Sequence, residues 1–354
     1  MLASERHEQI LRSLRRHGRL RVGDLAAELG VSAITVRRDL GELDSAGLLR
    51  RVHGGAVGIS PAAAPSSQGS QLTIGIVVPS STFYYTSVIR GAEETAARYG
   101  ARLVLGVSGY DVAVEQERIE KVLGIGVAGL LLSTALGDDR AAEISKTLDA
   151  IDVPVVLMER AFGFPHVERE YDHVRTDHAY GAMLALRHLV SLGHRRIGIN
   201  LDASVTAYWL RQGIEQAAEV LDVDLFISTT ELPAHGADPA TLAQHDAFLA
   251  ECDAFGARAV LIHSDEHAAR LTERALEAGV RIPDDLAVVA YNDETAALAV
   301  VPLTAVSPPK PLLGETACEL LLHKLNSAPA PIQHLSLLPD LRIRSSSGTP
   351  PASA

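Results

Sequence analysis

The chain has 354 residues, of which 47% are hydrophobic, and its formal net charge is −12 at pH 7. This length supports two or three domains that each bury a core. The two cysteines, Cys252 and Cys318, lie far apart, which excludes a disulfide framework or a zinc ribbon, and no apolar run is long enough to span a bilayer.

The charge is divided unevenly along the chain. Residues 1–57 contain ten Lys and Arg against seven Asp and Glu, whereas the remainder is strongly acidic. A basic segment attached to an acidic body is typical of a nucleic-acid-binding module, whose binding to DNA should weaken as salt rises. The first 20 residues are charged and amphipathic, unlike a signal peptide, so we expect a cytoplasmic protein.

Three amphipathic segments near the N-terminus are predicted as helices. They cover residues 4–17, Val22–Leu29 and a third stretch that follows Ser32 and runs to about Ala46. Gly30 allows a tight turn between the second and third helices, and the Ser32 side chain can cap the third. Two short helices joined by a Gly-containing turn form a helix-turn-helix, whose second helix enters the major groove of DNA.

The third predicted helix carries side chains that can read DNA. Arginine binds guanine or phosphate, and the methyl groups of Ala and Thr can contact thymine. Residues 48–57 then alternate apolar and basic side chains before Gly54 and Gly55, which indicates a β-wing reaching phosphate or the minor groove. The predicted DNA-binding residues are Ser32, Ala33, Thr35, Arg37, Arg38, Arg50, Arg51 and His53.

Two motifs carry a resemblance to the N-terminal domain of the DeoR family of bacterial regulators. They are Glu-Leu-Gly-Val-Ser-Ala-Ile-Thr-Val-Arg-Arg-Asp-Leu-Gly-Glu-Leu (28–43) and Leu-Leu-Arg-Arg-Val-His-Gly-Gly-Ala (48–56). The resemblance implies an α+β winged helix-turn-helix domain over residues 1–57. The alternative is a basic helical bundle used for protein contacts.

The composition changes again after residue 57. Residues 58–71 are rich in Pro, Ala, Ser and Gly and are predicted to form a flexible or extended linker. From residue 73 onward, short apolar runs alternate with amphipathic helical patterns, which predicts a parallel, doubly wound α/β fold. The expected strands are 73–78, 102–106, 129–133 and 155–158, and the expected helices are 85–99, 113–123 and 141–150.

The α/β pattern starts again after Asp177. The expected strands there are 196–201, 259–263 and 286–291, and the expected helices are 178–192, 207–220 and 265–278. Two consecutive units of similar size predict two lobes. Because ligands bind at the carboxyl ends of parallel strands, two facing lobes should form one cleft that closes by a hinge motion.

Residues 72–345 resemble the periplasmic-binding-protein-like effector domain of LacI/GalR regulators and sugar-binding proteins. The main motifs are Ile-Gly-Ile-Val-Val-Pro (74–79), Val-Pro-Val-Val-Leu-Met-Glu-Arg (153–160), Thr-Asp-His-Ala-Tyr-Gly (176–181) and Arg-Ile-Pro-Asp-Asp-Leu-Ala-Val-Val-Ala-Tyr-Asn-Asp (281–293). The resemblance implies a type I fold with crossovers between the lobes near 174–177, 306–308 and 328–334. Lobe one would then hold 72–175 and 308–330, lobe two 176–307 and 331–345, and residues 346–354 would form a disordered tail.

The same resemblance places ligand contacts at the strand ends that line the cleft. Aromatic rings can stack on a sugar, and charged or amide groups can pair with its hydroxyl groups. The residues predicted in this way are Thr82, Tyr84, Tyr85, Glu159, Arg160, Arg211, Ser264, Asp265 and Asn292, with Asp293 and Trp209 as further candidates. The alternatives are tyrosines that belong to the core and arginines that form surface salt bridges.

These observations together predict a sequence-specific transcriptional regulator. Its N-terminal domain would bind operator DNA, and a small carbohydrate between the lobes would change that affinity, with repression favoured over activation. A homodimer is expected because a symmetric dimer matches a palindromic operator. No catalytic motif, metal-ligand spacing or cofactor motif is present in the sequence. Two alternatives are a regulator that dimerises without ligand and a sugar-acting enzyme fused to a DNA-binding domain.

Overall fold

The computed structural model describes residues 6–7, 10, 19–45, 50–52, 55–57, 72–137, 140–161, 169–229, 232–233, 239–326 and 331–348. The chain divides into two compact units, Met1–Ser70 and Gln71–Ala354. His53, the linker predicted over 58–71, residues 349–354 and most of the helix predicted over 4–17 lie outside the described residues. Within the described parts, no helix is long and apolar enough to cross a membrane.

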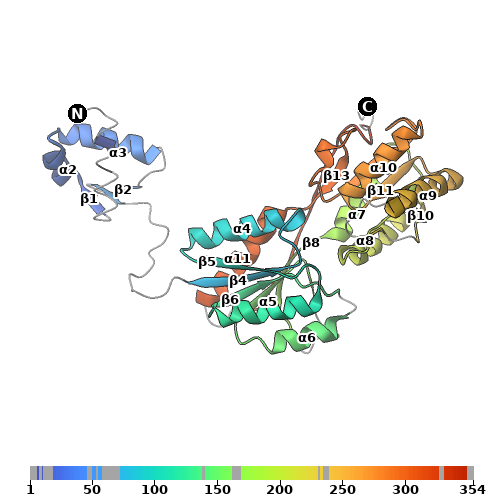
Figure 1. The fold of residues 1–354 in the computed structure, drawn as a ribbon. Helices are drawn as coiled ribbons and strands as arrows, with labels where there is room; N and C mark the ends of the chain where they lie inside the picture. The colour runs from blue at the N-terminus through green and yellow to red at the C-terminus, as the bar shows by residue number, and fades with distance from the viewer. Residues whose placement is uncertain are drawn as a thin grey trace. The chain divides into compact units, whose positions relative to one another are not determined.

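The described residues of the N-terminal unit include helices α2 and α3 and a small antiparallel sheet (Figure 1). Both helices confirm the sequence prediction: α2 covers Val22–Leu29 and α3 covers Ala33–Ser45. The Thr35 amide donates to Ser32 Oγ at 3.1 Å, so Ser32 caps α3 as expected. The sheet order is β1-β3-β2, formed by β1 (Arg19–Arg21), β2 (Arg50–Val52) and β3 (Gly55–Val57).

A buried ion pair holds α3 against the start of the chain. Arg6 Nε and Nη2 donate to the two carboxylate oxygens of Asp39 at 2.7 and 3.0 Å, and Asp39 is only 1% exposed. The hydrogen bond from Arg6 lowers the pKa of Asp39 against the opposing effect of burial. Together with the apolar core of α2 and α3, this pair fixes the orientation of α3 within the unit.

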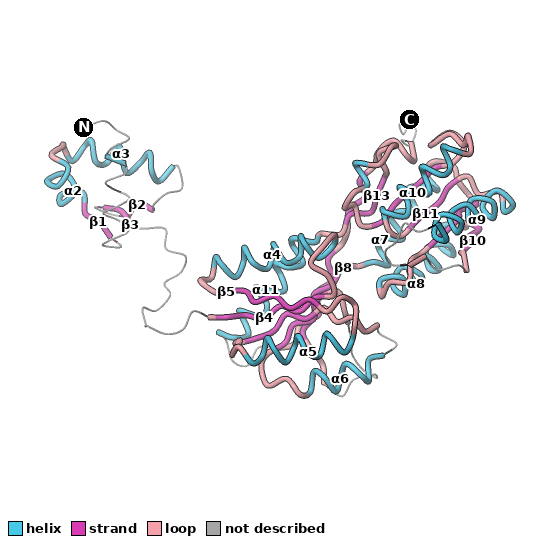
Figure 2. Tube along the Cα trace, viewed as in Figure 1, coloured by secondary structure: helices cyan, strands magenta, loops and turns pink. Residues whose placement is uncertain are grey.

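The C-terminal unit consists of two lobes, each with helices on both faces of a six-stranded sheet (Figures 1 and 2). The lobe-one sheet has the order β14-β8-β7-β6-β4-β5 and is parallel throughout. Its elements are β4 (Thr73–Val78), α4 (Tyr84–Arg98), β5 (Arg102–Val107), α5 (Val112–Gly124), β6 (Gly129–Leu132), α6 (Ala141–Asp149), β7 (Val155–Met158), β8 (Asp172–Thr176), α11 (Lys310–Asn326) and β14 (His334–Leu337).

The lobe-two sheet has the order β10-β9-β11-β12-β13-β15, and only β15 runs antiparallel. Its elements are α7 (His178–Ser191), β9 (Arg196–Asn200), α8 (Thr206–Leu221), β10 (Asp224–Ile227), α9 (Pro239–Phe255), β11 (Ala259–Ile262), α10 (Asp265–Glu277), β12 (Ala287–Tyr291), the short helix η2 (Ala296–Leu298), β13 (Thr304–Ser307) and β15 (Asp340–Arg342).

The hydrophobic patterns explain why the lobes have these layers. Strands β6 and β7 are buried at every position, which is typical of parallel strands covered on both faces. In lobe one, α4 and α11 pack on one face and α5 and α6 on the other; in lobe two, α7 and α8 lie opposite α9 and α10. The carboxyl ends of the parallel strands are therefore left open at one edge of each sheet.

The third connection between the lobes differs from the prediction. The chain crosses after β8, after β13 and after β14. Strand β14 pairs with β8 of lobe one, with His334 opposite His173, so the last crossing falls between Leu337 and Asp340 rather than near 328–334. Residues 334–337 therefore belong to lobe one, because a backbone pairing between distant segments decides their position.

The end of lobe two also lies later than expected. Ser346 Oγ donates to the Val288 carbonyl at 2.6 Å and accepts from the Thr304 amide at 2.9 Å. Ser346 and Ser347 are 0% and 4% exposed. The lobe therefore continues to Gly348, and the prediction of a disordered tail over 346–354 is wrong for residues 346–348.

Candidate functional site

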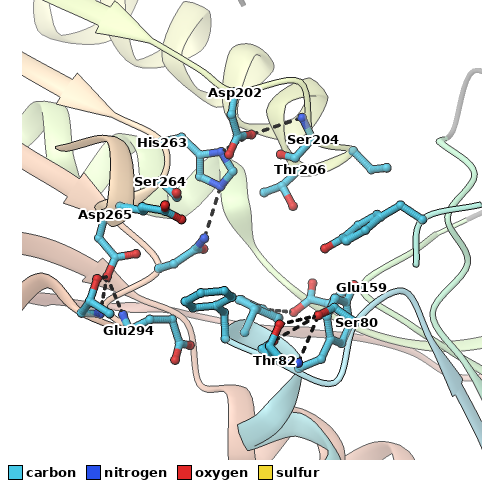
Figure 3. Close-up of a pocket in the computed structure, with 18 of the residues that line it drawn as sticks. Ser80, Thr82, Glu159, Asp202, Ser204, Thr206, His263, Ser264, Asp265 and Glu294 are labelled. Atoms are coloured by element: carbon cyan, nitrogen blue, oxygen red, sulfur yellow. Dashed lines mark hydrogen bonds and ion pairs between the residues drawn. The ribbon is translucent and has the colours of Figure 1, made fainter. Parts of the chain in front are cut away.

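A cleft lies between the two lobes of the C-terminal unit, at the carboxyl ends of both sheets (Figure 3). It contains about 1050 Å³ of empty space, part of it open to solvent. Lobe one contributes Ser80, Thr82, Phe83, Tyr84, Tyr85, Tyr110, Glu159 and Arg160. Lobe two contributes Asp202, Ser204, Val205, Thr206, His263, Ser264, Asp265, Glu266, Asn292, Glu294 and Thr295. The position matches the rule that open α/β sheets bind ligands at their carboxyl edge.

The structure brings all but one of the predicted ligand-binding residues to this wall. They are Thr82, Tyr84, Tyr85, Glu159, Arg160, Ser264, Asp265 and Asn292. The exception is Arg211, whose side chain is exposed on α8. Its neighbour Leu210 belongs to the core, and Arg211 is not among the residues that line the cleft.

The two further candidates are held by other side chains outside the cleft wall. Asp293 Oδ1 accepts from Arg344 Nη2 at 2.8 Å. The guanidinium of Arg175 lies 4.2 Å from the ring centroid of Trp209. Both interactions join segments that are distant in the sequence, which is why sequence reasoning could not separate them from ligand contacts.

The carboxylate of Glu159 is occupied by protein donors. The Tyr84 and Thr176 hydroxyl groups donate to Oε1, while the Thr176 amide and His178 Nε2 donate to Oε2 at 3.0 and 3.2 Å. Burial opposes ionisation, but His178 and the hydroxyl donors outweigh it and lower the pKa of Glu159 to about 2. Glu159 therefore stays ionised and joins lobe one to α7 of lobe two.

One carboxylate oxygen of Asp265 is likewise hydrogen-bonded to protein donors. Its Oδ2 accepts hydrogen bonds from the backbone amides of Glu294, Thr295 and Ala296 at 2.7, 2.5 and 3.0 Å. The side chain is 3% exposed. Asp265 thus fixes the loop after β12, which carries part of the cleft wall.

Arg160 is a fixed donor on the lobe-one side. Its Nε donates to the Thr134 carbonyl at 2.9 Å and its Nη1 to the carbonyl of Glu159 at 2.8 Å. Within the part of the chain that the structure describes, Nη2 makes no hydrogen bond. The guanidinium is therefore held in place with one nitrogen available to a bound molecule.

The remaining carboxylates of the wall are each paired. Asp202 contacts His263, Glu266 lies 3.5 Å from Arg270, and Glu294 forms an ion pair with Lys310. Among the described lining residues, Arg160 supplies the single guanidinium and no lysine is present. The cleft therefore offers hydrogen-bonding groups without an excess of positive charge, which suits an uncharged polar molecule better than a phosphorylated one.

Two aromatic residues that the sequence analysis did not select also line the cleft. Phe83 and Tyr110 are 51% and 43% exposed. Both have a positive φ, 48° and 62°, which is uncommon for residues other than glycine and often occurs at ligand sites. Tyr110 follows β5 as Thr82 follows β4, so its place after a predicted strand was the signal that could have found it.

The sequence analysis also left Asp202 and His263 out of the predicted ligand-binding residues. They follow β9 and β11, which are adjacent parallel strands, and His263 Nδ1 lies 2.8 Å from Asp202 Oδ1 (Figure 3). Both side chains are nearly buried. Each residue follows a predicted strand, but only the strand order shows that the two strands are neighbours.

The N-terminal unit places several predicted DNA-binding residues on α3 and β2. Ser32 and Arg38 are exposed and Thr35 is half-buried, and the Ser32 hydroxyl is used to cap α3. Ala33 and Arg37 belong to α3, while Arg50 and Arg51 belong to β2. His53 lies outside the described residues.

Three family models match successive parts of the chain. A DeoR-like helix-turn-helix domain matches residues 6–62. The model of periplasmic binding proteins and the sugar binding domain of the LacI family matches 71–231, and a periplasmic binding protein-like domain matches 186–347. These matches confirm the two resemblances seen in the sequence.

Similar proteins include several transcriptional regulators. The arabinose metabolism transcriptional repressor of Geobacillus stearothermophilus is 28% identical over 91% of this chain and 89% of its own length. The lac repressor dimer bound to operator is 22% identical with a TM-score of 0.67, covering 79% of this chain and 95% of that one. A LacI family regulator from Enterococcus faecium with bound ribose is 24% identical with a TM-score of 0.63, covering 78% and 99%. The two structures share the fold of the C-terminal unit.

Proposed function

Since this chain joins a DeoR-like helix-turn-helix domain to a LacI-type periplasmic-binding-protein-like domain, we propose that it is a transcriptional repressor whose DNA affinity is set by an uncharged sugar. The observation that carries this proposal is the interlobe cleft, whose wall combines aromatic rings with fixed hydrogen-bonding groups. A relative that aligns with 91% of this chain is the arabinose metabolism transcriptional repressor of Geobacillus stearothermophilus.

The chemistry of the cleft favours a carbohydrate over other small molecules. The exposed ring of Phe83 can stack on the apolar face of a sugar, and Arg160 and Asn292 can pair with its hydroxyl groups. Because the described lining residues include one guanidinium and no lysine, a phosphate group would lack cationic partners there. We therefore favour a neutral mono- or disaccharide.

The N-terminal unit would act as a winged helix-turn-helix on operator DNA. Helix α3 would enter the major groove, and the β2–β3 hairpin would be the wing. Arg38 is exposed on α3, where it can reach a phosphate or a guanine. Such binding would take place in the cytoplasm, where bacterial DNA lies.

Coupling between the cleft and DNA requires two arrangements of the lobes. A ligand shifts DNA affinity only if it binds one arrangement better than the other. The three connections between the lobes allow this hinge motion, and a homodimer would transmit it to two recognition helices on a palindromic operator.

The full chain, purified, would first be screened for thermal stabilisation by neutral mono- and disaccharides, with sugar phosphates as the comparison. A ligand that binds only the folded state stabilises it by about 2.7 kcal/mol at a hundred times its Kd. Fluorescence anisotropy with a DNA duplex enriched from a random library would then show whether the same sugar weakens DNA binding. Stabilisation by sugar phosphates alone, or by none of these compounds, would contradict the proposal.

A further inference from the structure

Asp202 and His263 form a buried polar pair on the lobe-two side of the cleft. Their exposed fractions are 4% and 3%, and both residues line the cleft wall. Burial opposes ionisation of Asp202, but the interaction with His263 and the amide of Ser204 outweigh it, so the pKa of Asp202 is lowered. The carboxylate is thus ionised at neutral pH and can only accept hydrogen bonds.

This arrangement determines where the imidazole carries its hydrogen. Because Asp202 Oδ1 can only accept, His263 Nδ1, 2.8 Å away, must donate. In the neutral ring, Nε2 is then an acceptor. The side-chain amide nitrogen of Asn292 lies 3.5 Å from Nε2, where it can donate to an acceptor nitrogen.

The contact between His263 and Asn292 is at the long limit for a hydrogen bond. Nε2 and the Asn292 amide therefore present a weakly paired acceptor and donor beside each other on the cleft wall. A hydroxyl group satisfies both, because it donates its own hydrogen and accepts another. An ether or a methylene group at the same place cannot donate to Nε2.

We propose that the Asp202–His263 pair is a specificity determinant that recognises one hydroxyl group of the ligand through Nε2 of His263. Asp202 acts as a positioning residue, because it orients the ring and sets its tautomer without facing the hydroxyl itself. The inference rests on the proposed function, since it names the group of the sugar that lobe two reads. Among the described residues, no hydroxyl group bonds Nε2, so the pair is not arranged to activate a nucleophile.

A first test needs no sugar. Nitrogen-15 NMR of the full chain with labelled histidine reports the tautomer of each ring, and the His263 signal is assigned by its loss in His263→Asn. We expect His263 to carry its hydrogen on Nδ1 at pH 7.5 and to lose this fixed tautomer in Asp202→Asn, whose amide can donate as well as accept. A wild-type ring with its hydrogen on Nε2 would overturn the inference.

The second test compares sugars with analogues that lack one hydroxyl group. Calorimetry would use D-ribose, L-arabinose and D-xylose with their monodeoxy analogues. We expect wild type to bind one of these sugars and to lose about tenfold or more in affinity for one of its analogues, because the analogue leaves Nε2 unpaired. The quantity compared is the ratio of the affinity for the sugar to the affinity for that analogue. In His263→Asn, which can still donate to Asp202 but does not reach the hydroxyl, this ratio should fall to near one. In His263→Gln, whose side chain reaches the position of Nε2, much of the ratio should return.

The matched control is His245→Asn, which truncates a fully buried histidine of α9 in the same lobe but outside the cleft wall. It should leave the ratio unchanged. If His263→Asn keeps the full ratio for every analogue while sugars still bind, the inference fails and the proposed function stands. If no sugar in this panel or in the stability screen binds wild type, the proposed function loses its support and the inference falls with it.

Discussion

Glu159 and His178 are hydrogen-bonded across the first connection between the lobes, with 3.2 Å between Oε2 and Nε2. Glu159 follows β7 of lobe one, whereas His178 begins α7 of lobe two. His178 Nδ1 also lies 3.0 Å from the hydroxyl of Tyr291 at the end of β12. Glu159, which lines the cleft, is thus linked through His178 to Tyr291 by hydrogen bonds that connect the two lobes at the hinge.

Glu159→Gln should destabilise the C-terminal unit in a pH-dependent way. The pKa of Glu159 is lowered from 4.5 to about 2, so its ionised form stabilises the fold fully above pH 4.5 and this stabilisation is lost as the pH falls toward 2. A shift of this size corresponds to about 3 kcal/mol. Thermal unfolding of both proteins between pH 3 and 7 should show a difference in melting temperature that becomes smaller on acidification. Glu93→Gln, at an exposed position of α4, is the control. A difference in melting temperature between Glu159→Gln and wild type that does not change with pH would contradict the assignment.

Asp39→Ala should unfold the N-terminal unit selectively. The substitution leaves Arg6 buried without its carboxylate, and breaking a buried pair in this way costs about 3–5 kcal/mol. We expect the N-terminal unit to melt earlier and DNA binding to be lost, while the melting of the C-terminal unit stays constant as an internal control. Replacing both residues, in Arg6→Met/Asp39→Leu, should recover part of the stability. Equal losses of stability in Asp39→Ala and in the double variant would argue against a stabilising Arg6–Asp39 pair.

Arg38→Ala should weaken DNA binding. The side chain is exposed on α3, and removing one phosphate contact should lower the slope of log affinity against log salt by about 1. Anisotropy titrations at several salt concentrations measure this slope. Arg98→Ala, an exposed arginine of the C-terminal unit, is the control. Unchanged affinity at physiological salt would remove Arg38 from the DNA interface.

Phe83→Ala and Arg211→Ala should have opposite outcomes for sugar binding. Phe83 exposes its ring to the cleft, so its truncation should reduce affinity about tenfold through lost stacking. Arg211 is exposed on α8 outside the cleft wall, so its truncation should leave affinity unchanged. Calorimetry with the sugar found in the stability screen distinguishes the two, and a strong effect of Arg211→Ala would require a different lobe arrangement in the bound state.

A chain that ends at residue 345 should be less stable than one that ends at 348. The shorter chain lacks Ser346, whose hydroxyl bonds to Val288 and Thr304 in lobe two, and it leaves these two backbone groups buried and unpaired. Each unpaired group costs about 1–3 kcal/mol. Chemical denaturation of the two truncated chains and the full chain measures the difference. Equal midpoints for all three would show that this segment does not contribute to lobe two.

The sequence predicted the elements whose hydrophobic pattern is strong and local. Strands β6 and β7 are short apolar runs, and α2 and α3 carry one apolar face and a clear cap. It did not reveal α9 and α11, whose apolar residues are spread around the helix, or the half-exposed edge strands β10 and β14. In these segments the position depends on packing between distant parts of the chain rather than on periodicity.

The same division holds for the cleft. The sequence by itself determined the two-lobe α/β class and placed Tyr84, Arg160 and Asn292 at the cleft wall, because residues after parallel strands gather at one edge. Only the tertiary structure decided that Arg211 lies outside the cleft wall and that Asp202 contacts His263. Those facts depend on helix rotation and on which strands are neighbours, and long-range packing sets both.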